Sequence, residues 1–598
     1  MKRLSCLALL VGAAACGGTD PTGPLTPPSP TPPSATWGVP ITGGTMMVST
    51  DGKYAIVSDP DRDRIAIVDL AKRTSIDTGL TAHDEPGRVV EDAAGRFHVA
   101  LRRGGAIVDF DSGGHILGRR AVCAEPRGIA YDASSDSVHV ACTSGELVTF
   151  PAAGGAATRK LLLDRDLRDI VVTQTGLLVS RFRTAQLIEL DAQGAVVSTD
   201  SVPDVQRLDG SGNAVAGTAA IAWRTIAMPD GTIVMSHQRQ VNAPLHTEPG
   251  GYGGMCGGGP VESALAVRSP GGTLRAAESI ANGALPVDLA VSNDGAQLAV
   301  VVAGADAVQL APASVISGSD QPPCGEIVPD EAIPQPQPIG LVGTTLEDGL
   351  GAPSSVAFDS AGNLLVYYPE YPGITVHQLT DGSTYNIQLS GGLGYDSGRE
   401  LFHTETQVGL ACASCHPEGR DDGLTWLFAD LGLRRTQSVA GHIMERAPYH
   451  WAGDMPDLST LMDNVFTGRM EGPTVTHSQK VSLGPWLETI QPPAAAPVVD
   501  PAAVARGGAL FASADTQCTT CHSGPLLTNK AKVDVGTGGL FEVPSLISVG
   551  ARPPFLHTGC AATLADRFGS CGGGDHHGHT SQLSAGDISD LVAYLETL

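Results

Sequence analysis

One short sequence plan recurs along the first two thirds of the chain. Each copy has a short apolar strand, a turn containing Asp or Gly, and a second strand in which apolar and polar residues alternate. The copies begin at Val48, Val90, Ala130, Ala290 and Val356. Where copies are adjacent they recur at roughly 40 residues, the length of a four-stranded propeller blade. The repeat therefore predicts an all-β propeller of six or seven blades over residues 37–385.

This repeat resembles the YVTN-type β-propeller of exported bacterial proteins. Such a domain is most often a scaffold without chemistry of its own. One segment interrupts the repeat: residues 237–259 are rich in Gly and contain His237, His246 and Met255. Long loops on repeat scaffolds often carry function. We expect this insertion either to cover a cofactor and offer it one of these side chains, or to be a surface loop fixed by a disulfide at Cys256.

Two five-residue strings follow the propeller region, Cys412-Ala-Ser-Cys415-His416 and Cys518-Thr-Thr-Cys521-His522. The spacing puts two thiols about one helical turn apart, where they can add to the vinyl groups of a haem while the adjoining His ligates the iron. A Cys-x-x-Cys pair alone also occurs in redox dithiols and zinc sites. The His that follows immediately in both strings favours two covalently bound c-type haems. His416 and His522 are then the proximal iron ligands.

The N-terminus has the features of an export signal. Met1-Lys2-Arg3 precedes an apolar run from Leu4 to Ala15, which is too short to span a bilayer and predicts a signal peptide over residues 1–15. Cys16 resembles the lipid-accepting cysteine of bacterial lipoproteins, although Ala13 stands where their lipobox usually has Leu. The alternative is an ordinary cleaved secretory signal. Either predicts the periplasm or the cell surface, and the first adds a lipid anchor in a bacterial membrane.

Pro-rich stretches divide the chain of 598 residues. Residues 16–36 are rich in Pro, Thr and Gly and predict an extended tether. Residues 491–503 are rich in Pro and Ala and separate a first cytochrome c module, 394–490, from a second, 504–598. The net charge of −26 argues against a nucleic-acid partner, because phosphates require clustered Lys and Arg. An acidic surface either steers a small basic electron-donor protein or only keeps an exported chain soluble.

The twelve cysteines agree with an oxidising compartment. Cys6 leaves with the signal, Cys16 carries lipid if the lipoprotein prediction holds, and four hold haem. The six others form sequence-local pairs: Cys123 with Cys142, Cys256 with Cys324, and Cys560 with Cys571. Because six cysteines allow fifteen connectivities, this pairing is one hypothesis among them.

Further short segments accompany each haem string in a fixed order. In the first module they are 398–402, 435–439, 448–453 and 469–472, and in the second 506–511, 524–528, 541–546, 553–559 and 591–598. Together with the strings they resemble the bacterial di-haem cytochrome c peroxidase and MauG family. The resemblance implies two mainly α cytochrome c modules, in which one haem stores and delivers an electron and the other meets peroxide. Family members also bind calcium between the modules, so calcium is a further candidate cofactor, with no ligands assigned.

The resemblance also directs attention to the surroundings of the first haem. Trp451 matches the family's Trp between the irons and is placed on the electron path, with packing as the alternative. The interval between His416 and Arg434, where the peroxidases supply a distal His, contains none. The first haem is therefore expected either to have an open face or to borrow a ligand from the segment beyond. The candidates are His442, Met444, His450 and Met470, with His442 and His450 to be tested first.

The second haem also departs from the family. The peroxidases ligate it with a Met after the block that contains His557, but this chain has no Met after Cys521. The corresponding position falls near Cys571, whose sulfur is not available as a thiolate if it forms a disulfide. His576, His577 and His579 lie just beyond, either as nitrogen ligands or as a polar loop. A nitrogen ligand in place of Met would lower the haem potential.

These observations predict an exported di-haem c-type cytochrome that acts as a peroxidase-like oxidoreductase. It would reduce hydrogen peroxide or oxidise a protein substrate, with electrons taken from a small electron-donor protein and passed between two haems. One alternative is a non-enzymatic electron-transfer protein that uses the propeller as a docking platform. Another is a binding protein whose propeller captures a ligand.

Overall fold

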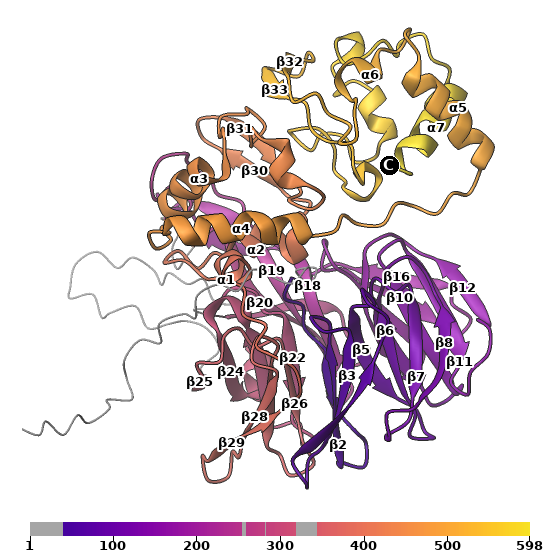
Figure 1. The fold of residues 1–598 in the computed structure, drawn as a ribbon, viewed down its shortest axis with the longest axis vertical. Coiled ribbons are helices and arrows are strands. Elements are labelled where there is room, and N and C mark those ends of the chain that lie inside the picture. Colours follow the sequence, from indigo (N-terminus) through magenta and orange to yellow (C-terminus); the bar gives the residue numbers. More distant parts are fainter. Residues whose placement is uncertain (1–39, 254–258, 281–282, 319–343) are drawn as a thin grey trace, which may run out of the picture. The chain divides into compact units, whose positions relative to one another are not determined.

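Seven antiparallel sheets follow one another along the chain (Figure 1). The first three are β1 (Met46–Val48), β2 (Tyr54–Asp59), β3 (Arg64–Asp69) and β4 (Thr74–Gly79); β5 (Pro86–Glu91), β6 (Phe97–Leu101), β7 (Ala106–Phe110) and β8 (Ile116–Ala121); and β9 (Pro126–Asp132), β10 (Ser137–Cys142), β11 (Glu146–Pro151) and β12 (Arg159–Leu162). The fourth and fifth are β13 (Leu167–Val172), β14 (Gly176–Arg181), β15 (Leu187–Asp191) and β16 (Val196–Asp200); and β17 (Val205–Leu208), β18 (Ala214–Ala227), β19 (Ile233–Val241), β20 (Val261–Arg268) and β21 (Leu274–Ile280). The last two are β22 (Asp288–Val291), β23 (Gln297–Val302), β24 (Ala307–Pro312) and β25 (Thr344–Leu346); and β26 (Ser355–Phe358), β27 (Leu364–Tyr368), β28 (Gly373–His377) and β29 (Thr384–Gln388).

These sheets are the blades of a seven-bladed β-propeller. The inner strands of successive blades, β1, β5, β9, β13, β18, β22 and β26, contact one another in turn, and β26 contacts β1. The ring is therefore closed between the last blade and the first. The prediction of a propeller is confirmed, with seven blades rather than six.

The computed structural model describes residues 40–253, 259–280, 283–318 and 344–598. The signal peptide, Cys16, Met255 and the predicted pair Cys256 and Cys324 lie outside these residues. The other two predicted disulfides, Cys123–Cys142 and Cys560–Cys571, are confirmed. Within the described residues, no helix is both long enough and apolar enough to cross a membrane.

The blade sequences explain their strand positions. The middle strands β2 and β3 are largely apolar and buried on both faces, because each blade is covered by its neighbours, whereas the outer strands β4 and β8 are largely exposed. The Asp of the repeat closes the turn between strands: Asp92 Oδ1 accepts hydrogen bonds of 2.9 Å from the backbone N–H groups of Ala94 and Arg96. Asp359 does the same for Ala361 and Asn363. The conserved spacing of the plan is therefore a turn requirement.

Residues 397–598 hold the two Cys-x-x-Cys-His strings. The first part contains α1 (Ser397–His403), α2 (Cys412–Cys415), β30 (Thr425–Phe428), β31 (Gly432–Arg435), α3 (Leu458–Leu461), a π-helix (Met462–Arg469) and α4 (His477–Thr489). The second contains α5 (Pro501–Ala512), α6 (Cys518–Cys521), β32 (Lys532–Asp534), β33 (Leu540–Glu542) and α7 (Ala585–Leu595). The described helices cover the smaller part of these residues, so a mainly α description is not confirmed.

The two parts nevertheless share one packing device. In each, the first helix packs against the last, α1 against α4 and α5 against α7. A glycine lies at each crossing: a Cβ on Gly398 would come within 2.6 Å of the Ser482 carbonyl, and one on Gly507 would overlap the Asp590 carbonyl. Gly398, which precedes Arg399, and Gly507, which follows Arg506, are therefore required because the two helices approach closely at each position.

Candidate functional site

A cavity of about 700 Å³ is lined by residues of both Cys-x-x-Cys-His strings. Its volume lies in the range of about 300–1,000 Å³ that is typical of ligand and cofactor sites. The first string contributes Cys412, Cys415 and His416, and the second contributes Cys518, Cys521 and His522. Leu, Phe and Val side chains from both parts, with Met side chains from the first, form much of the remaining wall. The fold thus brings together the two motifs that the sequence separates by about a hundred residues.

The cysteines of both strings stand on single helical turns. In α2 and in α6 the backbone N–H of the following His donates to the carbonyl of the first Cys, over 2.9 Å in each case. All four sulfurs are free thiols. Burial raises the pKa of Cys412 to about 12, and it raises the pKa of Cys415 well above the usual value of a thiol. Free thiols one turn apart in an apolar wall fit covalent attachment of haem, and they do not resemble a closed disulfide.

The two proximal-ligand candidates are anchored alike. The Nδ1–H of His416 donates to the Arg420 carbonyl over 3.2 Å, and that of His522 donates to the Leu527 carbonyl over 3.2 Å. A carbonyl only accepts, so this contact assigns the proton to Nδ1 and leaves the Nε2 lone pair free. Burial lowers the pKa of both imidazoles, which favours the neutral form that binds metals. The donor set fits a haem at each string.

The imidazole ring of His577 lies opposite that of His522, the histidine of the second string. Their ring centroids are 6.4 Å apart, with the ring planes inclined by 38°. Two imidazoles on opposite sides of one metal, each with a metal–nitrogen bond of about 2 Å, have centroids about 6 Å apart. Burial, with Arg567 second, lowers the pKa of His577 to about 3. Of the three predicted histidines, His576 lines the cavity but is exposed, and His579 is exposed and outside the lining.

The candidates for the first string are distributed differently. His450 and Met470 line the cavity together with Met444. His450 Nδ1 lies 3.2 Å from Asp454 Oδ1. His442 is exposed outside the lining, with its Nδ1 3.3 Å from Glu488 Oε2. Among the described residues, His416 has no ring contact like that of His522 with His577, although His450 lies near enough for its charge to add to burial in lowering the pKa of His416.

The propeller insertion reaches the cavity through a residue to which the sequence assigned no role. Tyr252 lines the cavity beside Cys415, its ring packs edge-on to Phe428 with centroids 6.0 Å apart, and its backbone N–H donates to the Arg469 carbonyl over 3.0 Å. Burial raises the pKa of Tyr252. His237 is instead buried inside β19, and His246 is exposed. The only advance signal was an aromatic residue between glycines in the insertion.

Trp451 lies where the two parts meet. Its indole N–H donates to the Arg435 carbonyl over 2.7 Å, and its ring centroid lies 6.1 Å from that of His557. His557 in turn stacks on Phe541 with centroids 3.9 Å apart. All three rings line the cavity. They form a continuous aromatic contact from the first part to the second.

Comparisons with known proteins yield similarity in structure only. No protein-family model and no curated protein matches this sequence. A hydrazine synthase structure from Kuenenia stuttgartiensis is similar over 60% of this chain and 97% of its own, at 14% identity and a TM-score of 0.43. A virginiamycin B lyase from Staphylococcus aureus is similar over 55% of this chain and 92% of its own, at 9% identity and a TM-score of 0.37. A streptogramin B lyase gives 56% and 94%, at 10% identity and a TM-score of 0.36. At these values the similarities carry no inference about activity.

Proposed function

We propose that this chain is an exported di-haem c-type oxidoreductase of the peroxidase-like class. The observation that carries the proposal is the cavity lined by both strings, with four free thiols and two anchored neutral imidazoles. Haem would be attached through Cys412 and Cys415 in one part and through Cys518 and Cys521 in the other. Once bound, it supplies one-electron chemistry, and the protein supplies binding, orientation and a dry pocket.

The two sites are proposed to have different duties. His522 and His577 would both hold the second haem, which suits storage and delivery of an electron. Nitrogen ligation on both sides lowers the potential relative to Met ligation. Trp451 and His557 would carry the electron between the sites. The first site has no imidazole from the described residues in ring contact with His416, so it would be free to bind hydrogen peroxide. Alternatively, it would oxidise a protein substrate bound at the surface.

His450 is proposed as the proton-transfer residue of the first site. Its ring borders the cavity while Asp454 holds its Nδ1, so its Nε2 can give or take a proton at the cavity. Tyr252 and Met470 would exclude water from the same wall. A small electron-donor protein, a lipid anchor at Cys16 in the periplasm or at the cell surface, and calcium between the modules remain expectations of this proposal.

Peroxide turnover by the haem-loaded, partly reduced protein tests it. We expect one haem to bind cyanide, peroxide to be consumed, and His450→Ala to lower turnover by about 10²-fold or more, while the exposed His442→Ala serves as the matched control. Two low-spin haems that refuse cyanide in every redox state would contradict the enzyme. That outcome favours the second candidate function, electron transfer without catalysis, to which the His522–His577 pair also points.

A further inference from the structure

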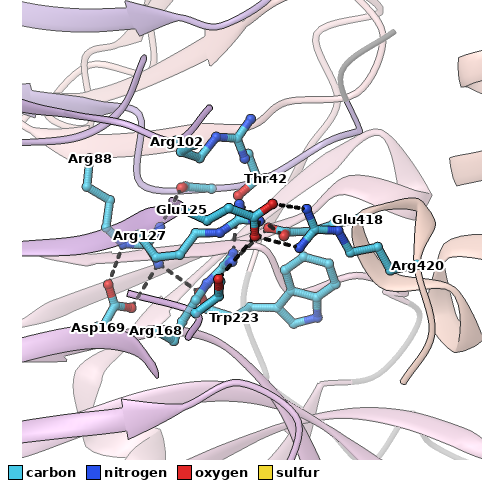
Figure 2. Close-up of polar contacts among 12 residues, drawn as sticks. Thr42, Arg88, Arg102, Glu125, Arg127, Arg168, Asp169, Trp223, Glu418 and Arg420 are labelled. Carbon is cyan, nitrogen blue, oxygen red and sulfur yellow. Dashed lines mark hydrogen bonds and ion pairs between the residues drawn. The ribbon is translucent and has the colours of Figure 1, made fainter. Parts of the chain in front are cut away.

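A buried polar cluster joins the propeller to the first haem string (Figure 2). Two residues of the string's following turn, Glu418 and Arg420, enter it from one side. The propeller side chains that meet them are Glu125, Arg127 and Arg168, each at most 6% exposed. Arg88, Arg102 and Asp169 extend the cluster within the propeller (Figure 2).

Glu418 is held by two arginines. Its Oε1 accepts from Arg168 Nη1 over 2.7 Å, and its Oε2 lies 3.1 Å from Arg127 Nη1. Arg168 is itself fixed, because its Nη2 donates to Thr42 Oγ1 over 3.1 Å and its Nε to the Trp223 carbonyl over 3.3 Å. The carboxylate therefore occupies a rigid, preformed site.

Arg420 is held by a carboxylate of the propeller. Its Nη2 and Nη1 donate to the two oxygens of Glu125 over 2.7 and 3.0 Å, a bidentate arrangement that fixes both position and orientation. Thr143 Oγ1 donates to Glu125 Oε2 over 3.1 Å and steadies it. The propeller thus grips the turn at two successive charged residues with opposite signs.

That turn carries the acceptor for the proximal histidine. The Gly419 N–H donates to the His416 carbonyl over 2.9 Å, the Arg420 N–H donates to the Pro417 carbonyl over 3.1 Å, and the Arg420 carbonyl accepts the His416 Nδ1–H. The side chain that Glu125 fixes and the carbonyl that orients the imidazole belong to the same residue. Displacing Arg420 therefore displaces the acceptor.

The second string provides an internal contrast. The equivalent turn, residues 523–527, is Ser-Gly-Pro-Leu-Leu and contains no ionisable side chain. The carbonyl that orients His522 belongs to Leu527. No charged grip of this kind is available to it.

We propose that Glu125, Arg127 and Arg168 are positioning residues for the first haem, through which the propeller sets the orientation and basicity of His416. A hydrogen bond from the Nδ1–H of a metal-bound imidazole raises its basicity as a ligand, and second-shell hydrogen bonding is a determinant of haem potential. This inference rests on the proposed haem binding at His416 and not on peroxide turnover.

The test measures the midpoint potential of each haem, and the iron–histidine stretching frequency of the reduced first haem, in Glu125→Gln, Arg168→Gln and Arg420→Lys. We expect the first haem's potential to rise and its iron–histidine stretch to move to lower frequency, with the potential of the second haem unchanged. Arg420→Lys keeps the charge but loses the fork, and is the variant least disturbing to folding. Arg165→Gln is the matched control, because it breaks a pair between the propeller and Glu596 of the second part.

Haem content separates the possible failures. Variants that carry both haems and show an unshifted first haem overturn the inference and leave the proposed function intact. A shift of equal size in Arg165→Gln overturns it as well, because the effect would then be a general loosening between the two regions. A wild-type protein that never attaches haem at Cys412 and Cys415 removes the proposed function itself.

Discussion

The two Cys-x-x-Cys-His strings share their Cys and His spacing and their local geometry but lie in contrasting surroundings. At the first, the turn after His416 is buried against the propeller through Glu418 and Arg420, and a propeller loop adds Tyr252 to the wall. At the second, the turn is uncharged and partly exposed, and a facing imidazole, His577, comes from within the same part. Under the proposed function, the shared motif would attach a haem at each string, and the surroundings would determine what each site can do.

The largest expected effect is the loss of one haem when the cysteines of one string are replaced. We expect Cys412→Ala with Cys415→Ala to remove the first haem only, and Cys518→Ala with Cys521→Ala to remove the second only. Haem staining and the haem-to-protein ratio measure this, with the ratio falling from two to one. Full loss from either double variant would contradict independent attachment.

The next largest effect is expected at the axial position of the second site. His577→Ala should convert this haem from low-spin to high-spin and let it bind cyanide, because the ligand facing His522 is lost. His577→Met should restore a low-spin haem at a higher potential. His579→Ala is the matched control, and a spectral change there equal to that of His577→Ala would argue against the assignment.

The loss of the buried ion pairs of Glu418 should lower the stability of the folded protein more than the loss of an exposed ion pair in the second part. Glu418→Ala leaves Arg168 and Arg127 buried without their carboxylate and should lower the free energy of unfolding by about 3–5 kcal/mol. Arg506→Ala removes the exposed pair with Asp590 in the second part and should change it little. Urea unfolding of the two haem-loaded variants compares them directly.

The aromatic contact between the strings should affect rate rather than stability. Trp451→Ala is expected to slow electron transfer between the haems about tenfold or more, and Trp451→Phe to slow it less because a ring remains against His557. Stopped-flow reduction, followed at the bands of the two haems, measures it. Equal rates in all three proteins would leave Trp451 with a packing role only.

The smallest effect is the pH dependence contributed by Glu542, which lines the cavity. Burial raises its pKa from 4.5 to about 7, so the folded protein holds a proton that the unfolded chain has released. The free energy of unfolding should therefore fall as pH rises from about 4.5 to about 7, by at most about 3 kcal/mol and by less to the extent that solvent screens the carboxylate. Glu542→Gln should flatten this dependence in urea titrations, whereas a steeper fall in the variant would show the sign to be wrong.

What the sequence predicted follows from how local each signal is. The propeller was predictable because Asp92 and Asp359 close turns within four residues of themselves. The fourth and fifth blades carry no clear copy: β13 and β14 are joined through a Thr-rich turn, and β18 runs for 14 residues. The number of blades could therefore be determined only from the structure, in which the strands of the seven sheets close the ring.

The site divides in the same way. The four cysteines and two histidines of the strings lie within five positions each, so the sequence alone proposes them as attachment residues. The choice among His576, His577 and His579 could not, because it depends on how the loop after the Cys560–Cys571 disulfide folds back to His522. Tyr252 meets Cys415 from more than a hundred and fifty positions away, and no spacing rule connects them.

Leu245, Tyr252 and Pro260 of the propeller belong to the cavity wall, so residues 394–598 alone do not form the complete cavity. A fragment that begins at residue 394 would lack these three side chains, and water would then reach the proposed first haem site. An insertion or deletion between β19 and β20 of the fifth blade would therefore alter the cavity wall directly.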